Sequence, residues 1–175
     1  MLAPLVRRTL ARRGETPILR HRAKHREKVS LIAALVFSAA LPEVGLHFRT
    51  YPRDYVNNVK AADFLRALLK ELPGEVVVLW DGGPMHKGEP IASLASHFAE
   101  RLVLERLPPF APMLNPVEWL WSWLKWERLS NFAPHDVQEL DGRVAAELAS
   151  KRADQGFLKN LFHASELPLP RALLS

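Results

Sequence analysis

The order of secondary structure between residues 75 and 104 constrains the fold of this chain more than any other feature. Residues 75–80 are apolar after Glu75 and rich in β-branched side chains, which predicts a short strand buried on both faces. Apolar positions recur at helical spacing between Ile91 and Phe98, and residues 102–104 give a second short strand. A strand, helix and strand in this order predict parallel pairing through a right-handed crossover. We therefore expect a mixed α/β fold.

The segments before this unit predict further strands and one helix. Residues 28–38 are almost continuously apolar and are predicted as a central strand, with a buried helix as the alternative. Residues 44–51 alternate apolar and polar side chains, which is typical of a half-buried strand. From Asn58 the period becomes helical, until Pro73-Gly74 stops it. Residues 2–10 are predicted as a short strand ahead of a turn-rich segment.

The second half of the chain is predicted to be mainly helical. Asn115 followed by Pro116 is a strong helix start, and another helix is predicted after Pro134. The tail from Phe157 onward is only loosely patterned. Because 175 residues with 48% hydrophobic side chains can bury one core, we predict a single domain over residues 1–175.

Charge and composition limit the class of partner. The formal net charge is +5 and the isoelectric point is near 9.8, with much of the basic excess before residue 30. This suits a polyanion, although a solvated basic arm explains it equally well. The absence of cysteine excludes disulfides and thiolate metal sites, and the longest apolar stretch is too short to cross a bilayer. A soluble, cytoplasmic protein without membrane contact is expected.

Two carboxylates in unlike settings are the leading candidates for chemistry. Asp81 ends the apolar run, and Glu118 lies two residues after Pro116, with 36 residues between the two acids. A strand end and a nearby helix can each hold an oxygen ligand for a divalent cation. Each acid also has a purely structural interpretation: Asp81 as a turn residue before Gly82-Gly83, and Glu118 as part of a capping box with Asn115.

Two sequence blocks resemble a known family. The block from Trp80 to Lys87 reads WDGGPMHK, and the block from Leu107 to Lys125 reads LPPFAPMLNPVEWLWSWLK. Together they resemble the DDE-type transposases of the bacterial insertion-sequence and Tc1/mariner group. The second block is the more specific, because it joins a proline-rich loop, Asn-Pro-x-Glu, aromatic residues and a helical lysine in one order. With the upstream stretch, the resemblance covers most of residues 5–130.

This resemblance implies an RNase H-like core, with a mixed sheet flanked by helices, in a bacterial cytoplasmic protein. It also implies a catalytic triad of two aspartates and a glutamate that binds two Mg²⁺ or Mn²⁺ ions. Asp81 matches the second aspartate and Glu118 the final glutamate, so both are the expected catalytic residues and metal ligands. The first aspartate belongs on the opening strand, ahead of the region where this chain begins, and the upstream DNA-binding region is expected to be absent as well.

That expectation has a consequence for activity. With two carboxylates only, a single ion would be held, and weakly, whereas in-line displacement needs ions on both the attacking and the leaving oxygen. Asp54 and Asp63 are the other aspartates before Asp81, and both are predicted to be solvated rather than to replace the missing ligand. We therefore expect an impaired fragment of a transposase.

The candidate nucleic-acid contacts are basic or aromatic and lie in the basic N-terminal stretch or close to the two acids. Trp121 is included because Trp119, Trp123 and Trp126 share one helical face at core spacing, which would point Trp121 away. His86 has a simple loop position as its alternative. The predicted set is Arg12, Arg13, Arg20, Lys24, His86, Lys87, Trp121 and Lys125.

The predicted function is DNA transposition by metal-dependent strand cleavage and strand transfer. DNA is the expected partner, and a homodimer is compatible with the resemblance. The first alternative is a nucleic-acid-binding or assembly module without catalysis. The second is an intact nuclease of the RNase H-like class that recruits Asp54 as its third ligand.

Overall fold

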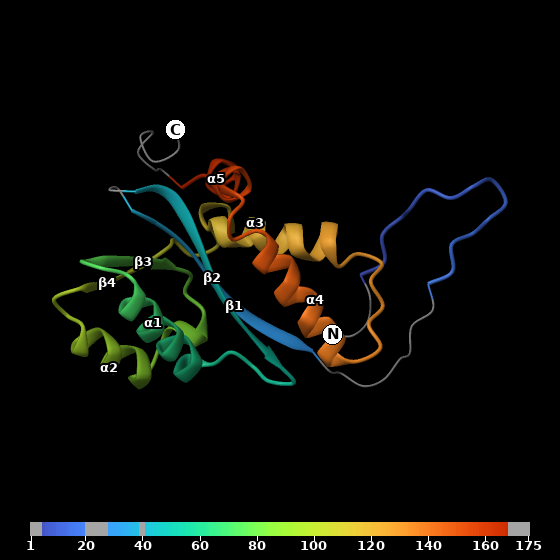
Figure 1. Cartoon of the computed structure of the whole chain (residues 1–175). Coiled ribbons are helices and arrows are strands. Elements are labelled where there is room, and N and C mark those ends of the chain that lie inside the picture. Colours follow the sequence, from blue (N-terminus) through green and yellow to red (C-terminus); the bar gives the residue numbers. More distant parts are fainter. Residues whose placement is uncertain (1–4, 20–27, 39–40, 168–175) are drawn as a thin grey trace.

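The computed structural model describes residues 5–19, 28–38 and 41–167. Two strands, β1 (Val29–Ser38) and β2 (Leu41–Pro52), form a long antiparallel hairpin whose register shifts between Phe37 and Ser38. Both had been predicted as strands, and the alternative of a buried helix for residues 28–38 is excluded. The hairpin runs through the centre of the molecule (Figure 1).

The unit between residues 75 and 104 has the predicted topology. Strand β3 (Val76–Trp80) pairs in parallel with β4 (Leu102–Arg106), and helix α2 (Glu89–His97) lies between them in sequence. Helix α1 (Asn58–Glu71) precedes β3 and is capped by Asn57, whose side chain accepts a hydrogen bond from the Lys60 N–H. The described strands thus form two hydrogen-bonded pairs, β1 with β2 and β3 with β4, in a mixed α/β fold.

The C-terminal half is helical. Helix α3 (Pro116–Trp123) continues directly into a π-helical turn, η3 (Leu124–Arg128), and is followed by α4 (Val137–Ser150) and α5 (Gln155–Ala164). Helix α5 differs from the prediction, because the tail from Phe157 is only loosely patterned in sequence. Its signals are an Asp154 N-cap, which accepts from the Phe157 N–H at 3.0 Å, and three buried residues at i, i+3 and i+4: Leu158, Leu161 and Phe162.

Two hydrophobic clusters form the core, and β1 contributes to both. The first cluster joins α1, α2, β3 and β4, and Ile32 and Ala34 of β1 pack against it. The second joins β2 with α3, α4 and α5, and β1 contributes Leu31, Ala33, Leu35 and Phe37. Because successive side chains of a strand point to opposite faces, β1 separates the two clusters. Figure 1 shows α1 and α2 on one side of the hairpin and α3 to α5 on the other.

The predicted burial of residues 75–80 on both faces is wrong. Val76, Val78 and Trp80 face the first cluster, whereas Val77 is 61% exposed and Leu79 is 44% exposed. Val103 on the neighbouring strand is 47% exposed on the same side. The physical reason is that the described part of the chain places α1 and α2 on one face of this strand pair and nothing on the other.

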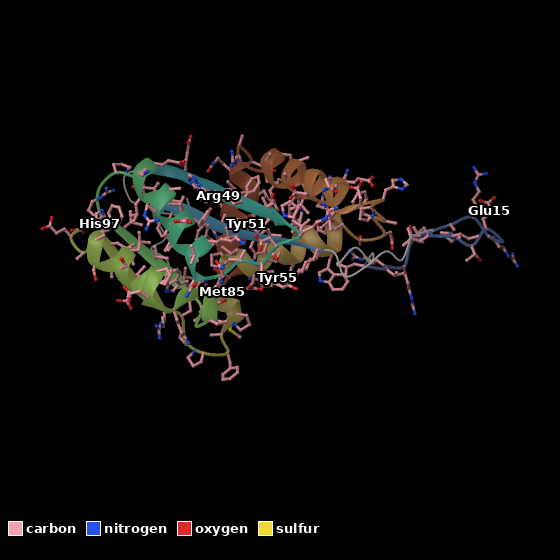
Figure 2. All side chains as sticks on the ribbon, turned by 90° about the horizontal axis from the view of Figure 1, so that it is seen from below. Glu15, Arg49, Tyr51, Tyr55, Met85 and His97 are labelled. Atoms are coloured by element: carbon pink, nitrogen blue, oxygen red, sulfur yellow. The ribbon has the colours of Figure 1, made fainter. Side chains whose placement is uncertain are left out.

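Residues 6–19 form an exposed arm that extends away from the body, with Glu15 near its far end (Figures 1 and 2). The strand predicted over residues 2–10 is absent from its described part, apart from an isolated bridge between Leu5 and Ser130. Asn131 attaches the arm: its side chain accepts from the Arg7 N–H at 2.8 Å and donates to the Arg7 carbonyl at 3.0 Å. Among the described residues, no helix has the length and apolar character that a membrane span requires.

Candidate metal centre and nucleic-acid surface

Asp81 follows the last residue of β3, at the carboxyl end of the parallel pair. The Leu107 N–H donates to the Trp80 carbonyl at 2.8 Å, so the chain leaving β4 lies beside this edge. The Asp81 side chain is 56% exposed, and its Oδ1 accepts a hydrogen bond from the Gly83 N–H at 2.7 Å. That bond forms the turn that the structural interpretation of Asp81 proposed. Oδ2 has no hydrogen-bond partner among the described residues.

Gly83 leaves room for the Asp81 and Met85 side chains at this turn. An added Cβ at residue 83 would lie 2.8 Å from Asp81 Oδ1 and 2.7 Å from the Met85 sulfur, which is closer than real contacts allow. A side chain at residue 83 would therefore shift the Asp81 carboxylate and the Met85 side chain from their present positions.

His86 is held against Asp81 rather than lying free in the loop. Its Nδ1 is 3.1 Å from Asp81 Oδ1 and 3.1 Å from the Asp81 carbonyl oxygen. The imidazole also stacks on the Trp80 ring with a centroid separation of 4.5 Å and an interplanar angle of 7°. His86 lies in a short 3₁₀ turn, η1 (Pro84–His86), and its side chain is 17% exposed. These contacts fix the ring and leave it beside the Asp81 carboxylate.

Glu118 lies in the first turn of α3 and does not form the capping box that its spacing allowed. Asn115 does cap the helix, because its Oδ1 accepts from the Val117 N–H at 3.2 Å. The Asn115 N–H, however, donates to the Pro112 carbonyl in the 3₁₀ turn η2 (Pro112–Leu114), and not to Glu118. The half-buried Glu118 side chain has no hydrogen bond or ion pair within the described residues. Its charge is favoured by the N-terminus of the helix.

The donor chemistry of these two acids fits a hard divalent cation, since carboxylate oxygens are the ligands that Mg²⁺ prefers. The number of donors is small. Among the described residues, no three His, Cys, Asp or Glu side chains form a group able to hold a metal ion, and this includes Asp81, His86 and Glu118. The structure thus brings Asp81 and His86 together and does not assemble them with Glu118 into a three-ligand site.

The other aspartates considered as ligands are engaged elsewhere. Asp54 forms an ion pair with Lys60 and accepts from the Tyr55 N–H, and the Lys60 hydrogen bond holds the pKa of Asp54 below its ordinary value. Asp63 pairs with Arg66 on the exposed face of α1 at 2.6 Å. Both carboxylates are therefore paired with cationic side chains in this structure.

The predicted arginine and lysine contacts are exposed wherever the structure describes them. Arg12 and Arg13 lie on the arm, Lys87 follows η1, and Lys125 lies in the π-helical turn. Arg20 and Lys24 lie outside the described residues. The exposed cations are spread over several elements.

The prediction for the tryptophans holds for Trp123, which packs against the second core cluster, and is wrong for the other three. Trp121 packs against the second core cluster, whereas Trp119 is 42% exposed and Trp126 is 49% exposed. Trp123 is half-buried, with its ring 4.8 Å from that of Phe157. The buried stripe of this helix is set by Leu120 and Leu124 at i and i+4, and that spacing was the signal in the sequence.

Comparison with known proteins supports one family. Residues 2–141 match the family described as DDE superfamily endonuclease, and this range contains both Asp81 and Glu118. Among solved structures, the chain is similar to the crystal structure of the catalytic domain of Mos1 mariner transposase. The sequence identity is 14%, the match covers 70% of this chain and 80% of that chain, and the TM-score is 0.32. No curated protein matches the sequence.

Proposed function

We propose that this chain, which belongs to the DDE superfamily endonucleases, acts in DNA transposition by metal-dependent strand cleavage and strand transfer. The observation that carries the proposal is the family match over residues 2–141, which contains a strand-end aspartate and a helical glutamate whose carboxylate has no partner among the described residues. The same match favours the RNase H-like arrangement of strands and helices for the complete site.

In this proposal, Asp81 and Glu118 are the metal ligands. A bound Mg²⁺ or Mn²⁺ ion supplies electrostatic stabilisation of the charge that develops at the phosphate. The chain contributes the orientation of the ligands: the Gly83 N–H and His86 fix Oδ1 of Asp81, which leaves Oδ2 to bind. The Asn115 cap begins α3 at the residue that places Glu118 in the first turn.

The proposed partner is DNA, held mainly through its phosphates. Arg12 and Arg13 on the arm, together with Lys87 and Lys125, supply exposed cations for this contact. Phosphate contacts position a protein on DNA without reading the sequence, and their strength falls steeply with salt.

The proposal is tested by removing each carboxylate in the purified protein. Asp81→Asn and Glu118→Gln should each weaken Mn²⁺ binding, measured by the loss of the free-ion electron paramagnetic resonance signal. They should also reduce Mn²⁺-dependent nicking of supercoiled plasmid by a factor on the order of 10², as when one electrostatic contact to a transition state is lost. Asp63→Asn is the matched control and should change neither. Unchanged Mn²⁺ binding and nicking in both site variants would refute the proposed roles.

A non-catalytic nucleic-acid-binding module is the second candidate function. It is favoured by the exposed basic arm and by the lack of a three-ligand group among the described residues. Salt-sensitive DNA binding that is identical in the wild type, Asp81→Asn and Glu118→Gln, without nicking, would select it. If the protein is instead a nuclease that uses Asp54 as its third ligand, Asp54→Asn should abolish cleavage. The ion pair between Asp54 and Lys60 argues against that result.

A further inference from the structure

The loop between β4 and η2 presents a phenylalanine to solvent. Phe110 is 99% exposed. Its backbone φ is +59°, in the left-handed region that residues other than glycine and asparagine rarely adopt. Burial of a phenyl ring is favourable and its exposure to water is not. The position therefore combines two local disadvantages, which a glycine or an asparagine would avoid.

The loop cannot readily turn this ring inward. Pro108 and Pro109 precede Phe110 and restrict the backbone, and Pro112 begins the 3₁₀ turn that follows. The Leu107 N–H donates to the Trp80 carbonyl at 2.8 Å and attaches the start of the loop to β3, and the Leu114 N–H donates to the Ala111 carbonyl at 3.1 Å within the 3₁₀ turn. The structure thus presents the ring on a stiff support.

The loop also lies between the two candidate ligands in sequence and starts beside one of them. It leaves β4 next to Trp80, the residue before Asp81, and leads to the Asn115 cap of the helix that carries Glu118. The exposed Arg106 at the end of β4 places a cation four residues before the ring. A cation at this edge suits the phosphate of a nucleotide whose base contacts the ring of the following loop.

We infer that Phe110 is a base-stacking residue, whose ring stacks on an unpaired base of the DNA strand beside the proposed metal ligands. The inference rests on the proposed action on DNA and deepens it. A single ring suits this role because every base has a face that an aromatic side chain can contact. A stable protein interface would need about 800 Å² on each partner, far more than one side chain supplies.

The test compares oligonucleotides that differ in one unpaired base, with Ca²⁺ in place of Mg²⁺ or Mn²⁺. A fluorescent 2-aminopurine is placed in an unpaired strand end, and binding is measured by anisotropy against a fully paired duplex. Phe110→Ala should weaken binding of the unpaired end roughly fivefold to a hundredfold, the size of one base stack, with the duplex unchanged. The 2-aminopurine signal change should disappear, and Phe110→Trp should retain it.

Two further variants separate stacking from a structural role. Phe110→Asn relieves the left-handed backbone, so its midpoint of thermal unfolding should equal or exceed that of the wild type while binding of the unpaired end is lost. Leu10→Ala removes another exposed apolar side chain, 100% exposed on the arm, and should leave both binding constants unchanged. The salt dependence should be equal in Phe110→Ala and the wild type, because no phosphate contact is removed.

The contrary results are distinguishable. Equal binding of both oligonucleotides by Phe110→Ala and the wild type, with wild-type nicking intact, would overturn the stacking role alone. Failure of the wild type to bind DNA at all would overturn both the stacking role and the proposed function. A change of oligomeric state in Phe110→Ala, with DNA binding unchanged, would assign the ring to a protein contact and overturn the inference.

Discussion

Strands β1 and β3 are both apolar but have different surroundings. Both are nearly continuous apolar runs, yet β1 packs against both core clusters, whereas β3 packs against one and exposes Val77 and Leu79. The difference comes from the helices. Helices α1 and α2 pack against β3 and against one face of the hairpin, whereas α3 to α5 pack against the other face of the hairpin and do not cover β3 (Figure 1). The comparison teaches that an apolar run predicts a strand more securely than it predicts the number of buried faces.

The two candidate ligands are oriented by different parts of the structure. Asp81 follows the half-covered strand, and the turn after it is fixed by local hydrogen bonds to Gly83 and His86. Glu118 lies on α3, which is anchored in the second cluster by fully buried Leu120. The orientation of Asp81 therefore depends on its turn, whereas that of Glu118 depends on packing of the helix.

The largest expected effect is a cavity in the second cluster. Leu120→Ala removes a side chain with no exposed surface, and we expect a loss of about 2–5 kcal/mol in the free energy of unfolding. Urea denaturation followed by circular dichroism measures it. A loss no larger than that of Val77→Ala would show that the second cluster is not better packed than the uncovered face of β3.

An ion network in the second half gives the next effect. Buried Glu147 of α4 accepts from Arg128 at 2.6 and 3.1 Å and pairs with Arg143 at 2.8 Å. Glu147→Gln should lower the free energy of unfolding by roughly 1–3 kcal/mol near pH 7, because it leaves Arg128 with a weaker partner. Exposed Glu100→Gln is the matched control and should be nearly neutral.

The same network predicts a pH dependence. Arg128 holds the pKa of Glu147 below its ordinary value of 4.5, so the folded state binds this proton less readily than the unfolded state. The ionised Glu147 therefore stabilises the folded state fully above about pH 4.5. This stabilisation is lost as the pH falls through the pKa that Glu147 has in the folded state. The difference in stability between the wild type and Glu147→Gln should shrink on acidification. A constant difference from pH 7 to pH 3 would contradict this assignment.

A smaller effect is expected where α5 holds the hairpin. The Gln155 side chain accepts from the Val44 N–H at 2.8 Å and donates to the Val44 carbonyl at 3.0 Å, as a neighbouring strand would. Gln155→Ala should lower the free energy of unfolding by about 1–2 kcal/mol through the loss of both bonds. Hydrogen exchange should show faster exchange of the Val44 amide. Gln155→Glu keeps the acceptor and should protect this amide more than Gln155→Ala does.

The smallest effect is expected on the uncovered face of β3. Val77→Thr keeps a β-branched side chain at a position that is 61% exposed, so the free energy of unfolding should change by less than about 0.5 kcal/mol. Chemical denaturation measures it, with the same substitution at the more buried Val76 as the comparison. A large loss in Val77→Thr would show that this face is covered in solution.

Local patterns in the sequence determined most of the elements and their kinds. The helix from Asn58, the parallel strands flanking α2, and the helix start at Asn115 all follow from side-chain period and capping within a few residues. The match of residues 2–141 to the DDE superfamily endonucleases likewise contains the two sequence blocks in which Asp81 and Glu118 were found.

Only the tertiary structure decided which faces are buried and how the site is held. Trp121 faces the core while Trp119 faces solvent, since Leu120 and Leu124 dock α3 in an orientation that aromatic spacing did not indicate. His86 beside Asp81, the free Glu118 carboxylate and the exposed Phe110 likewise depend on neighbours that are distant along the chain or on the path of a loop. The physical reason is that period and capping act over one or two turns, whereas burial depends on which elements meet in space.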